Sequence, residues 1–533
     1  MPGGAHRAGP AAQGKFMQIV LLRFPAVIPA GQFNVSSIAP PLSVACLAAY
    51  LKQRGLPVKV IDALGENLEK IEFVPGRNDI KSRGLSVGEI IARIPPDVDV
   101  LGVSCMFSSE WPFNREVIKA LKAAFPKAAI FAGGEHATAL PELVLAQAPG
   151  VDAVVLGEGE ETLLELIAAR AAGSDIGGIK GIALRKNGVI TKTPQRPRLK
   201  TLDEMPLPCW DAVPIENYFA SKQSHGPYLG KTLPILASRG CPYLCKFCSN
   251  AEMWGTYYTY RTPSSVVDEI ELYIAKYGIK CVEFYDLSPI IGKKWLYDFC
   301  SLLLSRNVKI YWQMAAGTRF EALDEELLGL VERAGCRYLG FAPESGSPEV
   351  LEEIGKKLVL ADFVRTVKAV VRHNLGIKAN FVIGFPKDTR LQILRTLLFQ
   401  LRLAFTGISD APIFLFSPYP GSEYFSDLVR QKVIGELDDD YLNSLGLNVS
   451  LKSGRRYCRN VGPFELSVYQ LCGSLLFYAV HYLTHPMKLI RGLIYWNSSS
   501  SVLEQRLKQN IKALLFGRNA KNRPAPRGGR AAP

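Results

Sequence analysis

The stretch SRGCPYLCKFCSN, residues 238–250, places Cys241, Cys245 and Cys248 in the spacing C-x3-C-x2-C. The other cysteines among the 11 in the chain are scattered singly, which is typical of reduced, mostly buried thiols in a cytoplasmic protein. Only these three therefore have the spacing of a metal-ligand set. The alternative is that they pack together in a turn and hold no ligand.

Three thiols suit some metal sites and not others. A structural zinc ion takes four protein ligands, and no second cysteine pair or histidine pair follows residue 248. Four-cysteine iron–sulfur spacings do not match either, since they supply one thiolate to each iron. On a 4Fe–4S cube, three thiolates leave one iron without a protein ligand. An open coordination position is what a catalytic metal site needs.

With the aromatic Phe247 before its last cysteine, the spacing resembles the signature of the radical S-adenosylmethionine (SAM) superfamily. The resemblance implies that the three cysteines ligate a 4Fe–4S cluster and that SAM binds the open iron through its amino and carboxylate groups. It also implies an external one-electron reductant, because one electron from the cluster cleaves SAM to a 5′-deoxyadenosyl radical.

Strand-like runs separated by helical stretches follow the cysteines. With residues 232–238 they make six strand and helix units, which predict a partial (β/α)6 TIM-like barrel over residues 231–430. The later runs are residues 281–286, 309–317, 338–346, 377–386 and 410–422. Functional residues of such barrels lie at the carboxyl ends of the strands. The candidates there are Asp286, Arg319, Glu344, Ser345, Gly384, Pro386 and residues 419–421. A salt-bridged structural role is the alternative for Arg319.

Two of these strand ends look like later motifs of the radical SAM family. ESGS, beginning with Glu344 and Ser345, resembles the element that contacts the ribose or amino acid part of SAM, and VIGFPKDT, which contains Gly384, resembles the glycine element near the adenine. With Phe247, these three residues are the SAM-binding candidates. Residues 387–388 are Lys-Asp where Gly-Glu is usual in the family. A helix-capping or loop role for Glu344 stays open.

Residues 17–175 alternate between apolar runs of strand length and helical stretches. The runs MQIVLLRFP, PVKVIDA, VDVLGVSCMF, AAIFAGG and VDAVVLG lack polar alternation, which is typical of parallel strands covered on both faces. Five such units predict an α/β, flavodoxin-like doubly wound domain. Ligands of such domains bind beyond the carboxyl ends of the strands.

Glycines and polar residues gather at these strand ends, in SCMFSS, GGEHAT and GEGEET. In this order, and with PPLSVACLAAYL before them, they resemble the cobalamin-binding domain at the front of many radical SAM enzymes. The resemblance makes the following residues candidates for cobalamin binding: Ser104, Gly133, Gly134, His136, Gly157 and Glu158. The alternatives are that the glycines only form turns and that His136 is a satisfied loop histidine.

One feature of many cobalamin domains is missing from the sequence. Domains that coordinate cobalt through a protein histidine carry an Asp-x-His-x-x-Gly loop, and this chain has none. After the second strand it reads DALGEN, residues 62–67, without a histidine. No histidine from that motif is therefore expected to coordinate cobalt.

The remaining parts of the chain connect or follow these two domains. Residues 1–16 and 518–533 are rich in Pro, Gly and basic residues and are expected to be a flexible leader and tail. Residues 176–230 are expected to be a linker and 431–517 a helical C-terminal region. The leader lacks the apolar core of a signal peptide, so a cytoplasmic protein is expected.

The positive charge of the chain lies mainly at its C-terminal end. Residues 451–533 hold fourteen of the 63 Lys and Arg against two acidic residues, a net +12 of the total +14. They also contain Leu466–Leu483, which has no formal charge and suits a helix at an anionic membrane surface, without crossing it. A helix that caps the barrel is the alternative. Nucleic acid is not expected, because no recognition motif accompanies the basic residues.

These patterns predict a cobalamin-dependent radical SAM methyltransferase that acts on an unactivated carbon of a small or lipid-like molecule, such as a hopanoid or another isoprenoid. In the reaction that the resemblance implies, the cofactors carry the chemistry and the protein supplies binding, orientation and exclusion of water. The first alternative is radical cyclisation, ring contraction or rearrangement without methyl transfer. The second is a non-catalytic cobalamin or metal sensor.

Overall fold

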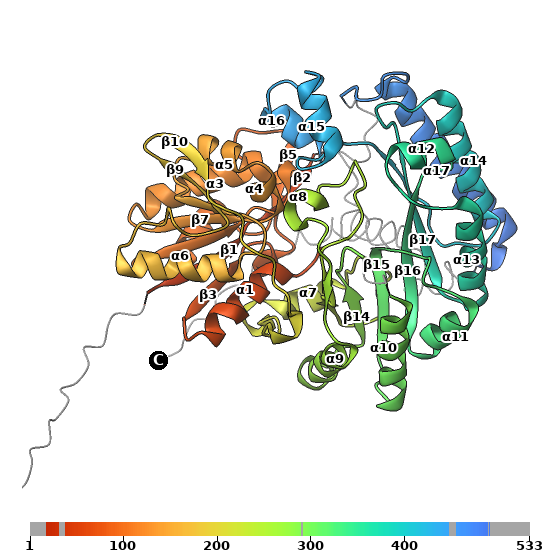
Figure 1. Ribbon diagram of the computed structural model, residues 1–533, viewed down its shortest axis with the longest axis horizontal. Coiled ribbons are helices and arrows are strands. Elements are labelled where there is room, and N and C mark those ends of the chain that lie inside the picture. Colours follow the sequence, from red (N-terminus) through yellow and green to blue (C-terminus); the bar gives the residue numbers. More distant parts are fainter. Residues whose placement is uncertain (1–16, 31–37, 289–291, 447–454, 489, 491–533) are drawn as a thin grey trace, which may run out of the picture.

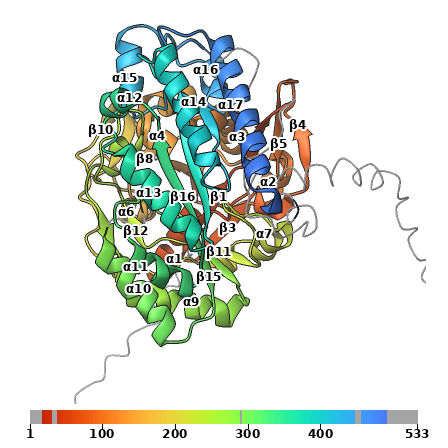
Figure 2. The same ribbon diagram turned by 90° about the vertical axis from the view of Figure 1, so that its right-hand side faces the viewer.

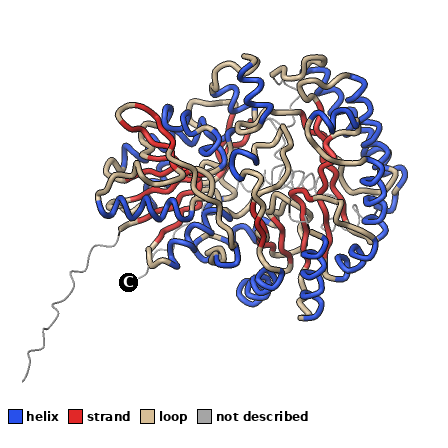
Figure 3. The backbone as a smooth tube through the Cα atoms, viewed as in Figure 1, coloured by secondary structure: helices blue, strands red, loops and turns tan. Residues whose placement is uncertain are grey.

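The computed structural model describes residues 17–30, 38–288, 292–446, 455–488 and 490. Two α/β bodies lie side by side in it, each built on one large sheet (Figures 1 and 3). The N-terminal body holds a seven-stranded sheet and the second body a six-stranded sheet. The expected flexible leader, residues 1–16, and tail, residues 518–533, lie outside the described residues.

The first sheet has the strand order β10-β9-β8-β7-β6-β1-β3. Its parallel strands are β1 (Ile19–Arg23), β3 (Val58–Asp62), β6 (Val100–Ser104), β7 (Ala129–Gly133) and β8 (Ala153–Val155). Numbered along the chain, these strands follow the order 2-1-3-4-5, which is that of flavodoxin-like folds. The doubly wound fold expected from the sequence is confirmed.

Helices cover both faces of this sheet. Along β1, Ile19 and Leu21 pack into the same core as helices α1 and α6, whereas Val20 and Leu22 pack with helices α2, α3 and α5. Successive strand residues point to opposite faces, so a strand buried on both sides has no polar alternation. The helices are α1 (Leu42–Gln53), α2 (Val87–Arg93), α3 (Trp111–Ala124), α4 (Glu135–Ala139), α5 (Pro141–Gln147) and α6 (Glu160–Ala172).

The first domain extends further along the chain than the sequence predicted. The strands β9 (Ile182–Lys186) and β10 (Val189–Lys192) form an antiparallel hairpin, and β9 pairs with β8. Residues 182–192 thus belong to the sheet and not to the linker, because pairing continues past β8. A separate sheet of β2 (Ala26–Pro29), β5 (Ile80–Arg83) and β4 (Ile71–Phe73) was also not predicted.

The second sheet is the predicted partial barrel. Its strands, all parallel and in chain order, are β11 (Thr232–Ile235), β14 (Cys281–Phe284), β15 (Tyr311–Thr318), β16 (Cys336–Glu344), β17 (Gly376–Ile383) and β18 (Ile413–Leu415). The helices between them are α9 (Pro263–Tyr277), α10 (Lys293–Ser305), α11 (Glu325–Arg333), α12 (Pro348–Glu353), α13 (Leu360–Arg372) and α14 (Arg390–Ala404). They line the outer, convex side of the sheet (Figure 1).

The C-terminal helices are α15 (Glu423–Arg430), α16 (Asp439–Ser444) and α17 (Pro463–Thr484). Helix α17 lies beside α14 and covers the edge strand β18 (Figure 2). The side chain of Gln470 donates a hydrogen bond of 2.8 Å to the Ile413 carbonyl, which would otherwise be an unpaired edge group. Among the described helices, α17 alone is long and apolar enough to cross a membrane, but 33% of its apolar window is buried.

Candidate active site

The three cysteines lie on one loop between β12 (Ser238–Arg239) and α8 (Asn250–Trp254). The loop follows the first barrel strand and faces the N-terminal domain, where Ser249 donates a hydrogen bond to Glu135 of α4 (Figure 1). This is the carboxyl-terminal side of the barrel strands, where the sequence placed the functional residues. The cysteine loop therefore lies at the junction of the two domains, with Cys241 and Cys245 partly buried and Cys248 exposed.

The three thiols lie close enough together to influence one another electrostatically. Burial, with a smaller contribution from the nearby Cys245 and Cys241 thiols, raises the pKa of the Cys248 thiol to about 12. The three thiols are thus neighbours, yet no group of three or more Cys, His, Asp or Glu in the described part of the chain converges on one ion position. In a 4Fe–4S cube each thiolate binds a different iron, so its ligands stand apart at separate corners.

Backbone hydrogen bonds hold this loop from two sides. The Lys246 N–H donates to the Ile354 carbonyl at the end of α12 (3.1 Å), and the Lys246 carbonyl accepts from the Tyr424 N–H at the start of α15 (3.0 Å). At the loop's start, Gly240 has a φ of 86° and lies so close to the Tyr257 carbonyl that a Cβ would be 2.2 Å from the oxygen. The position requires glycine on both counts.

Phe247 and Gly384 meet at one edge of the barrel. The Phe247 ring packs against Phe385, with ring centroids 5.6 Å apart. Gly384 has a φ of 85°, and a Cβ there would lie 2.9 Å from a methyl carbon of Leu466 in α17. The predicted SAM element is thus next to the cluster loop, and the C-terminal helix closes it from behind.

The unusual Lys-Asp pair at 387–388 has a structural explanation. The Asp388 carboxylate accepts hydrogen bonds from the N–H groups of Gly384 (2.9 Å) and Phe385 (3.1 Å), so it closes the turn from within. Burial raises its pKa to about 7, against the effect of these two donors. The departure from the family pattern leaves the turn intact.

Glu344 is the most strained of the predicted site residues. It has a φ of 65° at the end of β16 and is only 6% exposed. Its carboxylate pairs with Lys356 at 3.2 Å; burial raises its pKa and Lys356 lowers it. The N-cap position of α12 belongs to Ser347, so Glu344 caps no helix there. Left-handed backbone at a non-glycine residue costs about 1–3 kcal/mol and concentrates at functional sites.

Ser345 has a different environment from its neighbour. Its hydroxyl is 2.9 Å from the Thr396 hydroxyl of α14 and accepts a hydrogen bond from the Ser347 N–H at 3.1 Å. With 2% of its surface exposed, Ser345 shapes the loop that carries Glu344.

Two further strand-end candidates contribute to the shape of the site. The Arg319 guanidinium lies 4.0 Å from the centre of the Tyr243 ring in the cluster loop and donates to the Lys357 carbonyl at 2.8 Å. It also forms an ion pair with Glu321 at 2.7 Å. This contact agrees with the alternative that Arg319 has a salt-bridged structural role. Asp286 accepts from the Ala237 N–H at 3.2 Å and so ties β14 to β11.

In the N-terminal domain a pocket opens between β1 and β6, where the strand order reverses. Such a switch point is where ligands of doubly wound sheets bind. The pocket is lined by Arg23, Phe24, Ala26, Ser104, Met106, Phe107 and Glu110. Of the predicted cobalamin residues, Ser104 lines it directly. Burial raises the pKa of Glu110 to about 7, so the pocket wall has a carboxyl group that gains or loses a proton near neutral pH.

The residues of GGEHAT lie beside this pocket but point into the protein. His136 is 1% exposed, its Nδ1 is 2.9 Å from the Ser108 hydroxyl, and its ring lies 5.1 Å from Trp111. Burial lowers its pKa to about 3, so it is neutral. Gly134 has a φ of 117°, and a Cβ there would be 2.5 Å from the Cys105 carbonyl oxygen. The Gly134 contact favours a tight turn. The buried Nε2 of His136 has no hydrogen-bond partner among the described residues, so this histidine is satisfied at one ring nitrogen only.

Gly157 and Glu158 lie at the carboxyl end of β8, next to the barrel. The Glu158 carboxylate accepts hydrogen bonds from Arg198 (2.9 Å) and Arg239 (3.2 Å), and Arg239 also bonds Glu160 at 2.6 Å. Arg239 stands two residues before Cys241. The sequence did not single out either arginine, although an arginine just before the first cysteine and a Glu-rich strand end were visible signals.

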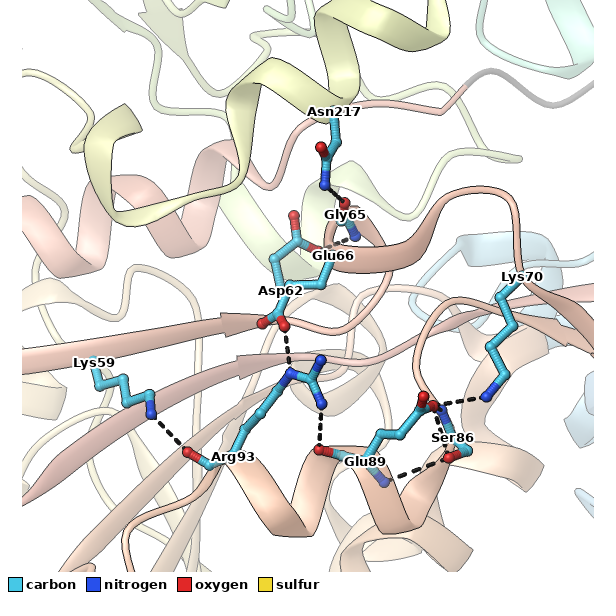
Figure 4. Close-up of polar contacts among 9 residues, drawn as sticks. All are labelled: Lys59, Asp62, Gly65, Glu66, Lys70, Ser86, Glu89, Arg93 and Asn217. Atoms are coloured by element: carbon cyan, nitrogen blue, oxygen red, sulfur yellow. Dashed lines mark hydrogen bonds and ion pairs between the residues drawn. The ribbon is translucent and has the colours of Figure 1, made fainter. Parts of the chain in front are cut away.

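The loop that replaces the cobalt-ligand motif is fully engaged in local contacts (Figure 4). The Asp62 carboxylate accepts from the Tyr218 hydroxyl at 2.6 Å and from the Gly65 N–H at 2.9 Å. Asn217 donates to the Gly65 carbonyl at 2.9 Å, and Arg93 bonds Glu66. These side chains fasten the loop to the linker helix α7 (Ile215–Ser221) and to α2. The sequence also missed Tyr218 and Arg23, which bonds it at 2.9 Å.

Comparisons with known proteins agree with this geometry. Residues 32–167 match the B12 binding domain family, and residues 235–399 match the Radical SAM superfamily. An uncharacterized methyltransferase of Pyrococcus horikoshii is 30% identical over 79% of this chain and 85% of its own.

The chain belongs to the cobalamin-binding radical SAM enzymes.

Two further relatives show the range of this family. A cytidylyl-2-hydroxyethylphosphonate methyltransferase of Streptomyces wedmorensis is 28% identical over 80% of this chain and 84% of its own. An anaerobic magnesium-protoporphyrin IX monomethyl ester cyclase of Rubrivivax gelatinosus is 28% identical over 75% of this chain and 68% of its own. The relatives of this chain therefore include both methyltransferases and cyclases.

Solved structures share the fold of this radical SAM enzyme. The methyltransferase TsrM of Kitasatospora setae, solved with cobalamin and a [4Fe-4S] cluster, has a TM-score of 0.61 at 16% identity, covering 87% of this chain and 89% of its own. OxsB, solved with aqua-cobalamin and SAM, has a TM-score of 0.63 at 16% identity, covering 95% and 76%. The order of a cobalamin domain followed by a radical SAM barrel is common to all three.

The family's cofactors are thus a 4Fe–4S cluster, SAM and cobalamin. The residues present fit them. The three cysteines offer thiols without a fourth, and the pocket beside Ser104 combines the exposed apolar Met106 and Phe107 with polar Arg23 and Glu110. Such a mixture of apolar contact and hydrogen-bonding groups suits a large ring with amide arms, although the pocket itself, at about 30 Å³, could receive only a small part of cobalamin.

Proposed function

We propose that this enzyme methylates an unactivated carbon of a small or lipid-like molecule, with hopanoids and other isoprenoids as the expected class. The observation that carries the proposal is the contact of Arg239, the last residue of β12 directly before the cysteine loop, with Glu158 and Glu160 of the cobalamin-binding domain. A radical formed at the barrel and a methyl carrier bound by the other domain must meet at one substrate. The methyltransferase names of the relatives support the same reaction.

The chemistry comes from the cofactors. When bound, they supply reductive cleavage of SAM, by an electron from an external reductant, and a transferable methyl group. The chain's own residues do the binding and positioning. We assign Cys241, Cys245 and Cys248 to the cluster. We assign the SAM side of the site to Phe247, Glu344, Ser345 and Gly384. Phe247 packs on the turn after β17, and the carboxylate of Glu344 is held in place by Lys356.

The cobalamin side of the proposed site is the edge of the N-terminal sheet. We propose that Ser104 faces cobalamin directly, because it lines the switch-point pocket. Gly133, Gly134, His136 and Gly157 would shape the loops around it, and Glu158 would hold the barrel against it. The lipid-like substrate is favoured by the apolar outer side of α17, which exposes Leu475 and Leu483 next to the barrel. We expect the enzyme in the cytoplasm, at the membrane surface.

The cyclase relatives favour a second candidate, radical cyclisation or rearrangement without methyl transfer. A sensor without catalysis is no longer an equal alternative, because the chain belongs to a family of enzymes.

One experiment separates the two enzymatic candidates. The anaerobically reconstituted protein is incubated with reductant, SAM labelled in its methyl group, and an isoprenoid lipid extract. We expect 5′-deoxyadenosine together with a lipid that has gained the labelled methyl, as seen by mass spectrometry. A product without the label would establish rearrangement instead. No 5′-deoxyadenosine with any fraction, in a preparation that contains iron, sulfide and cobalamin, would overturn the proposal.

A further inference from the structure

Helices α14 and α17 together expose an unusually apolar surface. On α14, Leu391, Leu398 and Phe405, which directly follows the helix, are 59%, 65% and 62% exposed. On α17, Phe464, Leu475 and Leu483 are 74%, 62% and 82% exposed. We call these six residues the apolar strip. Single exposed apolar residues are ordinary, whereas a contiguous set on neighbouring helices marks an interaction surface.

The two helices run parallel and in contact along the outside of the barrel (Figure 2). At their N-terminal ends Arg390 pairs with Glu465 at 2.7 Å, and at their C-terminal ends Lys488 donates to the Gly407 carbonyl. Between these points Gly473 lies so near α14 that a Cβ would be 2.7 Å from a Leu397 methyl carbon. These contacts fix the two helices to each other at both ends and in the middle.

The barrel already uses the other side of α17. Leu466, Gln470, Gly473, Phe477 and His481 are buried on it. Two of these side chains are polar, so the helix cannot be surrounded by lipid on all sides at little cost. A helix with one face committed to protein and the opposite face apolar suits the boundary of a bilayer, where such a face is buried among headgroups and upper acyl chains.

Charge indicates which partner the strip fits. No charged residue lies between Glu465 and Lys488 in the sequence, and α14 contains Arg395 and Arg402. Directly after α17, residues 485–533 contain ten Lys and Arg and one acidic residue. Basic residues beside an inserted apolar face each add about 1 kcal/mol of attraction to an anionic membrane. A second copy of this chain would bring the same positive charge to the contact.

We propose that the apolar strip of α14 and α17 docks this protein on an anionic lipid bilayer. The inference rests on the membrane-surface location given in the proposed function, which uses the same exposed side of α17, but it concerns only the outer side of the barrel and not the reaction. The sequence predicted membrane contact for the C-terminal region alone. The structure extends the proposed contact surface to α14, which packs against α17.

The test is flotation of the full, anaerobically reconstituted protein with vesicles of phosphatidylcholine, alone or mixed with phosphatidylglycerol. We expect binding to the mixed vesicles that weakens in high salt. The double variant Leu398→Gln, Leu475→Gln should lose at least about tenfold in partitioning, since two inserted leucines are removed. The matched control is Val189→Gln with Val359→Gln, two positions 63% and 60% exposed elsewhere, which should bind like the wild type.

Two outcomes would overturn the proposal. One is equal vesicle binding by the double variant and the wild type, or no binding by the wild type. The other is a wild-type dimer in light scattering that the double variant converts to a monomer, which would assign the strip to a second copy. Iron content and 5′-deoxyadenosine formation in the double variant report folding and chemistry separately, so failure of the proposed reaction and failure of docking are distinguishable.

Discussion

The Arg239 guanidinium lies 2.6 Å from the Glu160 carboxylate, so a residue two positions before the first cluster cysteine is bound to the cobalamin domain. Both side chains are buried, at 9% and 6% exposure, and Glu158 accepts a second bond from the same guanidinium. Burial lowers the pKa of this arginine, but its acidic partners more than offset that effect and the pKa is raised. The contact fixes the start of the three-cysteine loop against the N-terminal domain.

Replacing Arg239 should lower the free energy of unfolding much more than replacing an arginine of an exposed ion pair. Arg239→Met leaves Glu160 charged and without its partner, which we expect to lower the free energy of unfolding by about 3–5 kcal/mol. The control Arg372→Met removes the exposed pair with Glu325 and should change it by less than about 1 kcal/mol. Urea unfolding under anaerobic conditions measures both. Equal losses for the two variants would contradict a buried clamp, and Glu160→Gln added to Arg239→Met should recover stability.

Removing one cluster ligand should abolish radical chemistry but not cobalamin binding. Cys245→Ala leaves only two thiols for the cluster, so iron content and 5′-deoxyadenosine formation should both be lost. Cobalamin should still bind, since its pocket lies in the other domain. Cys472→Ala, at an exposed lone cysteine of α17, is the control and should behave like the wild type. Retained 5′-deoxyadenosine formation in Cys245→Ala would exclude the assigned ligand role.

The Glu344–Lys356 pair is predicted to position SAM. Lys356→Met should free the buried carboxylate from its fixed place and weaken SAM binding by about tenfold, which corresponds to ~1.4 kcal/mol. Equilibrium dialysis with labelled SAM on cluster-loaded protein measures the change. Lys357→Met, at the exposed neighbouring position, should bind SAM normally. If both variants bind equally well, the pair has no part in SAM binding.

Asp388 should give stability a recognisable pH dependence. Its pKa rises from 3.8 to about 7 in the folded protein because of burial. Between about pH 4 and pH 7 the folded state binds a proton at Asp388 that the unfolded chain does not bind. The free energy of unfolding therefore falls as the pH rises towards and through about 7. Relative to Asp388→Asn, which does not titrate, the wild type should lose on the order of 2 kcal/mol between about pH 5 and pH 8. Parallel pH profiles of the two proteins would contradict this.

The sequence was most informative where the signal is local or periodic. The spacing of Cys241, Cys245 and Cys248 lies within one loop, and unbroken apolar runs mark strands buried on both faces, so the cluster loop and both sheets could be predicted. The sheet continues past the boundary drawn at residue 175. The antiparallel hairpin of β9 and β10 is hard to predict because its apolar, buried run is only three residues long, residues 182–184, and β10 is mostly exposed.

Contacts between distant residues could not be predicted from the sequence. Arg239 and Glu160 are 79 positions apart, and nothing in either local pattern names the other. Asp388 looked like a departure from the family motif, but the structure gives it the role of closing the turn around Gly384. Similarly, His136 follows a glycine pair that suggested a ligand site, yet its ring is buried against Trp111.

The metal content of one preparation tests the central claim, that the cluster and cobalamin occupy one clamped protein, most directly. Iron and cobalt are measured by mass spectrometry in protein reconstituted without oxygen and freed of unbound cofactors. We predict about four irons per cobalt, the ratio of one 4Fe–4S cluster to one cobalamin. Iron without cobalt, or cobalt without iron, would contradict the account.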